Sequence, residues 1–394
     1  MTDHPRQSDA GDRPVRVMIL TASIGAGHNS AARAVAAELQ QRSDRLDVQV
    51  VDLLDHCRAF FRFYYVGGYF FSMTRTPRIY GLGYWLSDRP DRAGRTMGER
   101  LRMAWERWML RPLAEMLKQT QPDLIINTHY VQGPLIARLI DTGQLNCRQV
   151  TVVTDVAMHR WWYSERVSHW FVPQEVTARR LEGWGIDSSD CTVSGLPIHP
   201  KWDRPLNIGQ IRETWSLSAD RPIVLISGGA EFTVGPIVKI TRDLVRRCPE
   251  AMFLVLAGRN KKLLARLTNL SQQVQQGRLR VLGFTDRINE LVELSDLVLT
   301  KPGGLITAEC LSKSKAMLLI NPVPGQEGGN AKFYASQGVA RIARGRKQIV
   351  QTTLDLLAQP EKLQDMAARA AQLHRRGRQN VAAAVLERLS DPAD

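Results

Sequence analysis

Residues 295–310 read SDLVLTKPGGLITAEC, and this stretch decides the fold. The apolar run from Asp296 to Leu299 predicts a buried strand, and the Gly-Gly pair after it predicts a tight turn that opens a helix. The free amides and the dipole at a helix start favour anionic or oxygen-rich groups. Glu309 falls about one and a half turns into this helix, where its carboxylate could accept hydrogen bonds from two vicinal ribose hydroxyls while the helix start meets a diphosphate. A surface glutamate behind an ordinary turn is the simpler alternative.

A second polar loop follows the next predicted strand, and residues 321–330 read NPVPGQEGGN. Gln326, Glu327 and Asn330 supply donors and acceptors suited to sugar hydroxyls. An ordinary Pro/Gly turn would explain one such loop. Two polar loops at adjacent strand ends are harder to explain by packing alone, so they favour a ligand site.

Two further glycine turns follow predicted strands in the same half of the chain. They read Ser227-Gly228-Gly229-Ala230 and Ala257-Gly258-Arg259-Asn260. Simple turn chemistry explains any one of them. Three Gly turns at strand ends in one chain favour a shared polar ligand, such as a phosphate, in a cleft.

The first half opens in a similar way, with Gly25-Ala-Gly27-His28 between a strand and an Ala-rich helix that runs to Leu39. The loop is not a P-loop, because no Gly-Lys-Ser/Thr follows. It also departs from the dinucleotide pattern, because Ser30 occupies the third glycine position. Taken alone, this loop is only weak evidence for a ligand.

Outside these turns, short β-branched runs alternate with longer amphipathic runs, as is typical of parallel sheets covered by helices. We expect strands at Val15 to Thr21, Val48 to Leu53, Asp123 to Asn127, Gln149 to Thr154, His169 to Val172, Thr192 to Ser194, Pro222 to Ile226, Met252 to Ala257, Arg280 to Leu282, Asp296 to Leu299 and Met317 to Ile320.

A polar connector at 207–220 separates the two series of strands. We therefore predict an α/β protein of two Rossmann-like doubly wound domains, at 15–205 and 206–394, behind a disordered tail at 1–14. The C-terminal helix could pack back on the first domain. The carboxyl ends of both sheets should face a cleft between the domains, which is the expected site.

The composition excludes several classes of protein. The chain has 394 residues, a formal net charge of +14 and a pI of about 9.9, and at 44% hydrophobic residues it is too apolar to be wholly disordered. It shows no secretory signal, and no run of ~18 apolar residues that could cross a bilayer. Five widely spaced cysteines fit reduced thiols. We expect a cytoplasmic protein that contacts the inner face of the plasma membrane only peripherally.

Residues 58–111 hold eleven Arg and four acids, which is half of the net charge. Eleven of the chain's 27 aromatic residues lie within the 26 residues from Phe60 to Trp85. Arginines interleaved with large rings suit an anionic bilayer surface, and they could equally suit nucleic acid. In a third interpretation, these aromatic rings pack in an ordinary helical core and the arginines form a solvated face.

At these motifs the chain resembles the monogalactosyldiacylglycerol synthases and processive diacylglycerol glucosyltransferases, relatives of the enzyme that adds N-acetylglucosamine to the lipid-linked peptidoglycan precursor. The matching pieces are Gly25-Ala-Gly27-His28, Val153-Thr154-Asp155, Ser194-Gly195-Leu196-Pro197-Ile198, Ser227-Gly228-Gly229, Thr300-Lys301-Pro302-Gly303-Gly304, and Gly325-Gln326-Glu327 with Asn330. The resemblance covers most of the chain and is weakest over the segment 58–111, which this family associates with membrane docking.

The resemblance implies a GT-B fold and an inverting transfer of a hexose from UDP-glucose or UDP-galactose to diacylglycerol or a related lipid, with no metal or other cofactor. The N-terminal half would bind the acceptor and the C-terminal half the donor. The nucleotide-sugar site would then comprise Gly228, Gly229, Arg259, Phe284, Lys301, Gly303, Gly304, Thr307, Glu309, Gln326, Glu327 and Asn330. The acceptor side would comprise Gly25, Gly27, His159 and Trp161. The aromatic residues Trp161, Trp162 and Tyr163 could line an apolar path for the acceptor, and they could equally be core residues.

Inverting transfer needs a base for the acceptor hydroxyl and stabilisation of the departing diphosphate. His28 is the first candidate for the base, because it starts a helix at the cleft and imidazole titrates near neutrality. Asp155, at the end of an apolar strand, could take the proton itself or orient His28. Capping or positioning roles are the alternative for both. The sequence contains no Asp-x-Asp pair, so a metal bound in that manner is not expected.

Three other functions remain open from the sequence. The nearest keeps the fold and changes the acceptor to another lipid or a polyprenyl-linked sugar. A UDP-sugar epimerase would use the same architecture without an acceptor. A nucleic-acid-binding protein without catalysis fits the pI, but the basic density lies away from the Gly turns and no nucleic-acid motif is present, so we expect no nucleic-acid partner.

Overall fold

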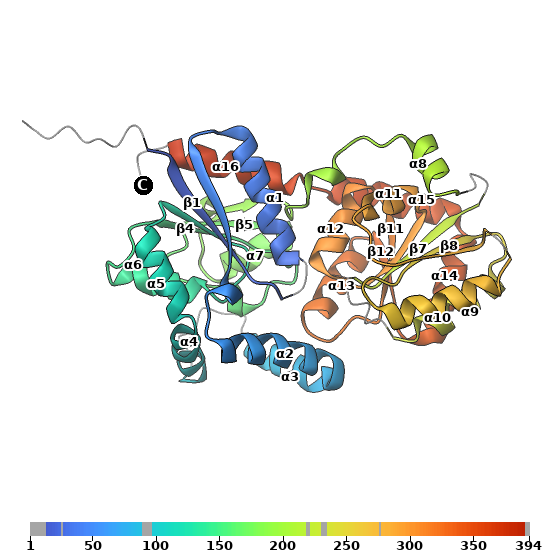
Figure 1. Cartoon of the computed structure of the whole chain (residues 1–394), viewed down its shortest axis with the longest axis horizontal. Coiled ribbons are helices and arrows are strands. Elements are labelled where there is room, and N and C mark those ends of the chain that lie inside the picture. The colour runs from blue at the N-terminus through green and yellow to red at the C-terminus, as the bar shows by residue number, and fades with distance from the viewer. Residues whose placement is uncertain are drawn as a thin grey trace, which may run out of the picture.

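The computed structural model describes residues 13–24, 27–88, 97–217, 221–229, 235–275 and 277–390. Within them the chain forms two parallel six-stranded sheets side by side, each covered by helices (Figure 1). This arrangement confirms the predicted α/β class with two doubly wound sheets. We call the first sheet with its helices the first lobe and the second sheet with its helices the second lobe.

The first sheet has the strand order β2-β1-β3-β4-β5-β6. Its strands are β1 (Val15–Thr21), β2 (Leu46–Asp52), β3 (Leu124–Asn127), β4 (Arg148–Val152), β5 (His169–Val172) and β6 (Cys191–Val193). The helices that follow are α1 (Gly27–Arg42), α2 (Ala59–Arg75), α3 (Pro77–Ser87), α4 (Met97–Met109), α5 (Arg111–Thr120), α6 (Gly133–Asp141) and α7 (Glu175–Gly183).

The second sheet has the order β12-β11-β10-β7-β8-β9. Its strands are β7 (Ile223–Ser227), β8 (Met252–Leu256), β9 (Leu279–Leu282), β10 (Leu297–Thr300), β11 (Ala316–Ile320) and β12 (Ala340–Ala343). Its helices are α9 (Ile237–Arg247), α10 (Lys261–Gln272), α11 (Ile288–Leu294), α12 (Gly304–Ser312), α13 (Gln326–Ser336), α14 (Gly345–Leu357) and α15 (Pro360–Leu373). α8 (Ile208–Thr214) follows the connection between the sheets, and α16 (Gly377–Ser390) ends the described chain.

All eleven predicted strands are present, because each is a short apolar run bounded by polar turns. In β7, for example, every residue is buried, as expected for a strand covered on both faces. The sequence analysis missed β12, whose second residue, Arg341, is an exposed base at the edge of the sheet. A four-residue edge strand with one solvent-facing arginine does not give a continuous apolar run.

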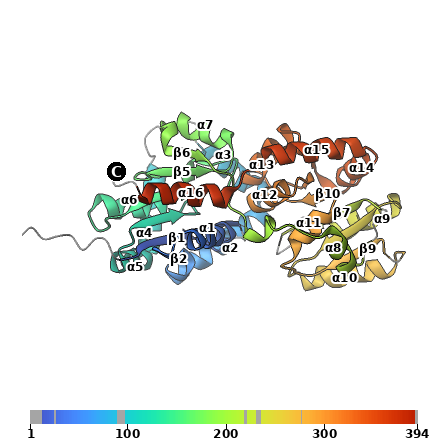
Figure 2. The ribbon, with the colours of Figure 1, turned by 90° about the horizontal axis from the view of Figure 1, so that it is seen from above.

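The C-terminal helix α16 returns to the first lobe, where it lies along the sheet (Figure 2). Val381, Ala382 and Val385 are buried in the same core cluster as residues of β1 and β4. The final helix therefore gives the chain a second connection between the lobes, in addition to the segment between β6 and β7.

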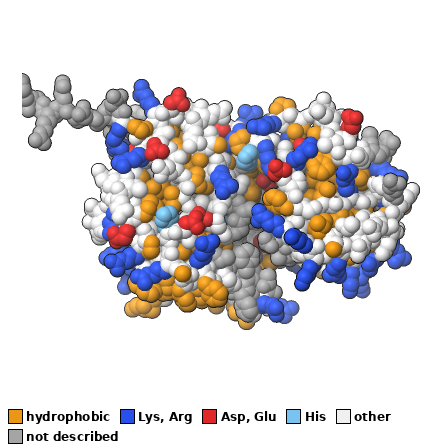
Figure 3. Space-filling model, viewed as in Figure 1, with side chains coloured by type: hydrophobic (Ala, Val, Ile, Leu, Met, Phe, Trp, Pro, Cys, Tyr) orange, Lys and Arg blue, Asp and Glu red, His pale blue; other side chains and the backbone are white. Residues whose placement is uncertain are grey.

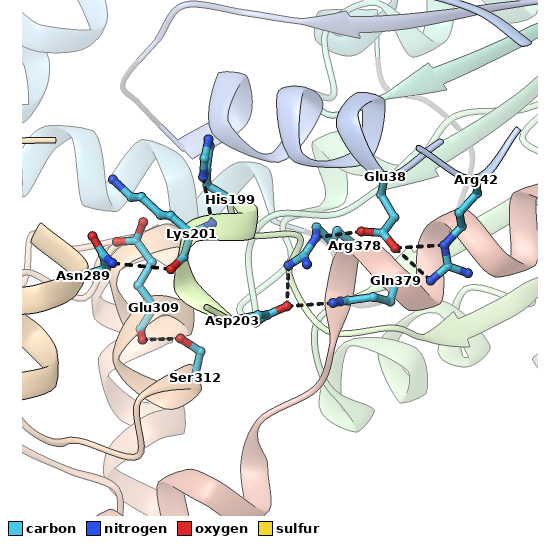
Figure 4. A network of polar contacts seen from close by, with 10 residues as sticks. All are labelled: Glu38, Arg42, His199, Lys201, Asp203, Asn289, Glu309, Ser312, Arg378 and Gln379. Carbon is cyan, nitrogen blue, oxygen red and sulfur yellow. Dashed lines mark hydrogen bonds and ion pairs between the residues drawn. The ribbon is translucent and has the colours of Figure 1, made fainter. Parts of the chain in front are cut away.

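A buried polar network fixes this second connection (Figure 4). Arg378 of α16 pairs with Glu38 of α1 at 2.8 Å and with Asp203 at 2.6 Å. Asp203 belongs to the segment that links the two sheets, and Gln379 donates to it at 2.7 Å. Both connections are thus tied together at one point beside α1.

The basic aromatic segment forms α2, α3 and α4 on one edge of the first lobe. Phe61 is fully buried, but several large apolar side chains of the segment are exposed: Phe60, Phe63, Tyr64, Ile79, Leu82, Trp85, Leu86, Met97, Leu101 and Trp108. Figure 3 shows hydrophobic side chains gathered along the lower edge of the first lobe, over α2 and α4. The interpretation that these side chains pack in a helical core therefore holds for Phe61 and not for the exposed ones. Within the described residues, no helix is long and apolar enough to span a membrane.

Candidate functional site

A cavity of about 430 Å³ lies where the two lobes meet. Its walls come from the loops after β1, β3 and β4, from α2, α3 and α4, and from the start of α13 in the second lobe. Much of the wall is aromatic: Tyr64, Tyr65, Tyr80, Tyr84, Tyr130, Trp161 and Trp162. His28, Asp155 and His159 line the same cavity, so the structure brings together most of the residues predicted for catalysis and for the acceptor.

His28 is the second residue of α1 and points its ring into this junction. Its Nδ1 lies 2.8 Å from the backbone carbonyl oxygen of Thr128 and 3.1 Å from the Thr154 hydroxyl. Because a carbonyl only accepts, Nδ1 carries the proton and Nε2 keeps a lone pair. Burial lowers the pKa of His28, and the negative charge of Asp155 partly opposes that shift. His28 is therefore a neutral imidazole at neutral pH, with one nitrogen able to accept a proton.

Asp155 lies three residues beyond the end of β4 and is only 6% exposed. Its carboxylate accepts a hydrogen bond from the side-chain amide of Gln326, at the start of α13. Burial raises the pKa of Asp155, while the hydrogen bond from Gln326, and the positive charge of His28 once that ring is protonated, act in the opposite direction. A residue of the second lobe thus holds a carboxylate of the first lobe beside the candidate base.

Close backbone contacts join the lobes around this point. Gly304, the first residue of α12, lies so near the Thr154 backbone carbonyl that a Cβ atom would overlap it. Asn330 is fully buried; its amide oxygen accepts from the Ala157 amide at 3.0 Å, and its amide nitrogen donates to the Pro302 carbonyl at 3.1 Å. Both ends of the Asn330 side chain are therefore used within the protein, and the bond to Ala157 crosses between the lobes.

The helix α3 also reaches the second lobe. The turn before α13 places Gly325 against the rings of Tyr80 and Tyr84, with a Cβ position 3.2 to 3.3 Å from them. Gly325 has a φ of +102°, a backbone conformation that favours glycine. The aromatic edge of the first lobe therefore contacts the loop that carries Gln326.

The glycine turns of the second lobe lie at the carboxyl ends of β7 and β8. Gly228 is buried, and Gly229 is exposed with a φ of +77°, so its backbone is open to a ligand. After β8, the Arg259 guanidinium stacks over the Phe284 ring, 4.7 Å from its centroid. Phe284 is 59% exposed, so this pair presents a flat surface beside the turns.

Lys301, at the end of β10, forms an ion pair with Glu327 at 3.3 Å. Glu327 also accepts a hydrogen bond from the Val323 amide at 3.0 Å, which holds the loop before α13. The Thr307 hydroxyl donates to the Gly303 carbonyl at 2.8 Å and so braces the first turn of α12. These residues support the two polar loops that the sequence placed at adjacent strand ends.

Glu309 is on α12, apart from the residues that line the aromatic cavity, and is only 8% exposed. Figure 4 shows it close to Lys201 and Asn289, beside the segment that links the sheets. Burial raises the pKa of its carboxyl to about 8, despite the opposing positive charge of Lys201. In the free protein, this carboxyl therefore holds a proton at neutral pH.

The acceptor side contains two predicted residues with defined partners. His159 Nε2 lies 2.9 Å from the Tyr84 carbonyl, and its Nδ1 accepts from the Trp161 amide at 3.1 Å. Trp161 packs edge-to-face on His159. Gly27 begins α1, where a Cβ atom would lie 3.8 Å from the Cβ of Leu305 in the second lobe, and Gly25 lies outside the described residues.

Sequence reasoning missed several residues of the cavity. His129 packs edge-to-face on His28, with 4.6 Å between ring centroids, and burial lowers its pKa well below the ordinary histidine value. Tyr65 donates to the Tyr130 hydroxyl at 2.6 Å. Arg102 pairs with Glu106 on α4. Tyr65 belongs to α2, and Arg102 and Glu106 to α4, which fold over the strand ends, whereas His129 and Tyr130 belong to the loop after β3. No local motif marks the contact between these segments. Within the described part of the chain, no group of three or more His, Cys, Asp or Glu is arranged to hold a metal ion.

Two families match this chain. The family described as Monogalactosyldiacylglycerol (MGDG) synthase matches residues 28–198, and the Glycosyltransferase family 28 C-terminal domain matches residues 223–382. The first match begins at His28 and includes the cavity residues of the loops after β3 and β4. The second match covers the sheet that carries the glycine turns of the second lobe.

Curated relatives match the chain over most of its length. The processive diacylglycerol beta-glucosyltransferase of Bacillus subtilis (strain 168) is 27% identical over 373 residues, which cover 91% of each chain. The protein of the same name from Staphylococcus carnosus (strain TM300) is 25% identical over 357 residues, 89% of this chain and 87% of the relative.

Solved structures share the fold. Acinetobacter baumannii MurG has a TM-score of 0.62 at 17% identity and covers 95% of this chain and 100% of its own. The Staphylococcus aureus MnaA-UDP co-structure has a TM-score of 0.61 at 15% identity, with 95% and 97% covered. The two-lobed architecture is thus the predicted GT-B fold.

Proposed function

This chain belongs to the family of monogalactosyldiacylglycerol synthases and processive diacylglycerol glucosyltransferases, and on that premise we propose that it transfers a hexose from a UDP-sugar to diacylglycerol with inversion. It is a UDP-sugar-dependent glycosyltransferase, and UDP-glucose and UDP-galactose are the candidate donors. The observation that carries the proposal is the His28–Asp155 pair in an aromatic cavity at the junction of the lobes.

In this proposal, His28 is the base. Its Nε2 lone pair takes the proton of the acceptor hydroxyl as the oxygen attacks the anomeric carbon, and the bond from that carbon to the diphosphate breaks on the opposite face. Asp155 stays ionised and stabilises the imidazolium that forms, in the way that a buried carboxylate supports a catalytic histidine. Gln326 keeps the carboxylate in place from the second lobe.

The second lobe would hold the nucleotide mainly through its backbone. The amides at Gly228, Gly229 and the start of α12 would face the diphosphate, where a helix N-terminus and its dipole favour negative charge. Lys301 directly precedes the turn before α12 and would donate to the diphosphate in place of its free-protein partner Glu327. Phe284 with Arg259 offers a surface on which the uracil ring can stack, and Glu309 would accept the ribose hydroxyls.

We propose that the transfer needs no bound metal. The support is the donor set itself, since backbone amides, the α12 dipole and Lys301 can offset the charge that develops on the leaving diphosphate. The absence of an Asp-x-Asp pair from the sequence agrees with this proposal.

We further propose that α2, α3 and α4 dock on an anionic membrane surface. Exposed rings such as Phe63, at 79% exposure, and Trp85, at 71%, would enter the headgroup boundary, and the arginines of the segment would attract anionic lipids. This edge of the first lobe forms part of the cavity wall, so a lipid in the membrane would reach His28 directly. Flotation with anionic vesicles should weaken as salt is raised, and binding to RNA or DNA is not expected.

Mass spectrometry of lipid products tests the transfer. The protein would be incubated with diacylglycerol in mixed micelles, with UDP-glucose or UDP-galactose in separate reactions. A hexosyl diacylglycerol from one of these donors supports the proposal. Conversion of the UDP-sugar without a lipid product would instead indicate an epimerase, and a product formed only from another lipid would change the acceptor.

A further inference from the structure

A partly buried ion pair lies in the wall of the acceptor cavity, and the proposed transfer chemistry does not use it. Arg102 and Glu106 are one turn apart on α4, with 2.6 Å between Nη1 of Arg102 and Oε1 of Glu106. Glu106 is only 5% exposed, and burial raises the pKa of its carboxyl. Apolar residues of similar volume generally stabilise a protein as well as a buried pair does. The pair therefore needs an explanation other than stability.

Arg102 has hydrogen-bonding capacity to spare. A guanidinium carries five N–H donors, and Glu106 accepts from Nη1. Nε of Arg102 is buried without a hydrogen-bond partner among the described residues. The guanidinium lies 5.6 Å from the centroid of the Trp161 ring, so it belongs to the same wall as the predicted acceptor residues.

The surroundings limit what these donors can bind. Glu106 neutralises Arg102, so the pair has no net charge that would attract an anion. The other walls are largely aromatic and suit an apolar molecule. The fitting ligand is therefore neutral and mostly apolar, and it carries oxygen atoms that accept hydrogen bonds without donating them.

Diacylglycerol has that chemistry beyond its single hydroxyl, because its two ester carbonyls only accept hydrogen bonds. We propose that Arg102, oriented by Glu106, donates to an ester carbonyl of the acceptor and so selects ester-linked over ether-linked glycerolipids. This inference rests on the proposed function and deepens it. His28 engages the acceptor hydroxyl, and Arg102 distinguishes an ester linkage of the acyl chains from an ether linkage.

The test compares two acceptors that differ only in their ester carbonyls: 1,2-dioleoylglycerol, which has two, and its 1,2-dioleyl ether analogue, which has none. We expect kcat/KM for the ester to exceed that for the ether by about 10- to 100-fold, as for a hydrogen bond to a charged donor. Equal kcat/KM values for the two lipids in the wild-type protein would overturn the inference, and this comparison needs no variant.

The double variant Arg102→Met with Glu106→Leu removes both charges, so it leaves no unpaired charge in the cavity. Its ester-to-ether ratio should fall to about one. Arg100→Met is the matched control, because it removes an exposed arginine of the same helix and should keep the wild-type ratio. A double variant that retained the ester preference would contradict the role of Arg102. If the wild-type protein made no glycolipid from either lipid, the proposed function itself would fail.

Discussion

The two lobes meet at one site but contribute to it in different ways. The first lobe offers side chains such as the half-buried His28 and the buried Asp155 and Glu106, whose pKa values are displaced by desolvation. The second lobe offers mainly backbone, at turns such as the exposed Gly229. The comparison suggests that proton transfer belongs to side chains of the first lobe, and nucleotide binding to amides and a few side chains of the second. Substitutions in the two lobes should therefore separate turnover from donor affinity.

The largest effect is expected for His28→Ala. Without the imidazole, no group takes the acceptor proton, and kcat should fall by roughly 10² to 10⁴-fold. UDP affinity, measured by calorimetry, should change little, because the donor contacts come from the other lobe. A His28→Ala protein that kept wild-type turnover would break the division between the lobes.

Asp155→Asn should lower kcat by about 100-fold, because the imidazolium loses its stabilising charge. The pH profile adds a second readout. A neutral base loses activity as pH falls through its pKa, and burial already places the pKa of His28 below the usual histidine range. Since Asp155 raises the pKa of His28, its removal should move the acid limb of kcat to lower pH. A shift toward higher pH would contradict the pairing.

The junction itself can be disturbed without touching a titrating group. In Gly304→Ala the new methyl group meets the Thr154 backbone carbonyl, so the lobes must move apart, and kcat should drop by up to about 100-fold. UDP binding should weaken less than kcat falls, because Gly304 would serve the diphosphate through its backbone amide. Gly229→Ala is the contrasting variant. Among the described residues the new methyl group meets no neighbour, and the substitution is strained by the positive φ, so it should weaken UDP binding more than it lowers kcat. Identical kinetic defects in the two variants would argue against separate roles.

Glu309→Ala should weaken UDP binding by roughly 5- to 10-fold, the size expected for a lost hydrogen bond. The pKa of Glu309 lies at about 8, so its carboxylate form becomes populated only as the pH rises through that value. UDP affinity should therefore rise between pH 7 and pH 9 in the wild-type protein. In Glu309→Gln, UDP affinity should no longer change between pH 7 and pH 9. Calorimetry at several pH values measures this, and an affinity that still rose with pH in the variant would contradict the role of Glu309.

The smallest effect is expected from removal of metals. Dialysis against EDTA should leave the rate of hexose transfer unchanged within experimental error, because amides and Lys301 offset the diphosphate charge in this account. Loss of activity that returned with added Mg²⁺ or Mn²⁺ would show that the second lobe needs a metal as well as its backbone.

The fold could be predicted because its signals are local. Each strand is a short apolar run, and each ligand turn is a glycine pair or a polar loop at a strand end. The edge strand β12 was not predicted because Arg341 interrupts its apolar run. The same local reasoning placed His28 and Asp155 at a cleft edge, and the structure brings both into one cavity.

The site residues that the sequence did not predict are brought together by contacts between distant segments. Arg102 and Tyr65 reach the cavity only because α2 and α4 fold across the ends of the strands. Gln326 was expected to bind sugar hydroxyls, yet in the free protein its amide holds Asp155, 171 positions away in sequence. Asn330, another predicted sugar ligand, uses its amide oxygen to bond Ala157 of the first lobe and its amide nitrogen to bond Pro302 of its own lobe. Residue type alone does not reveal such cross-lobe bonds.

The most direct test of the central claim is the anomeric configuration of the lipid product, read by proton NMR after reaction of an α-linked UDP-hexose with diacylglycerol. If His28 activates the hydroxyl for a single displacement across the junction, the product is the β-glycoside, with the large coupling of a trans-diaxial anomeric proton. An α-glycoside, or the lack of any glycolipid from both donors, would contradict the account.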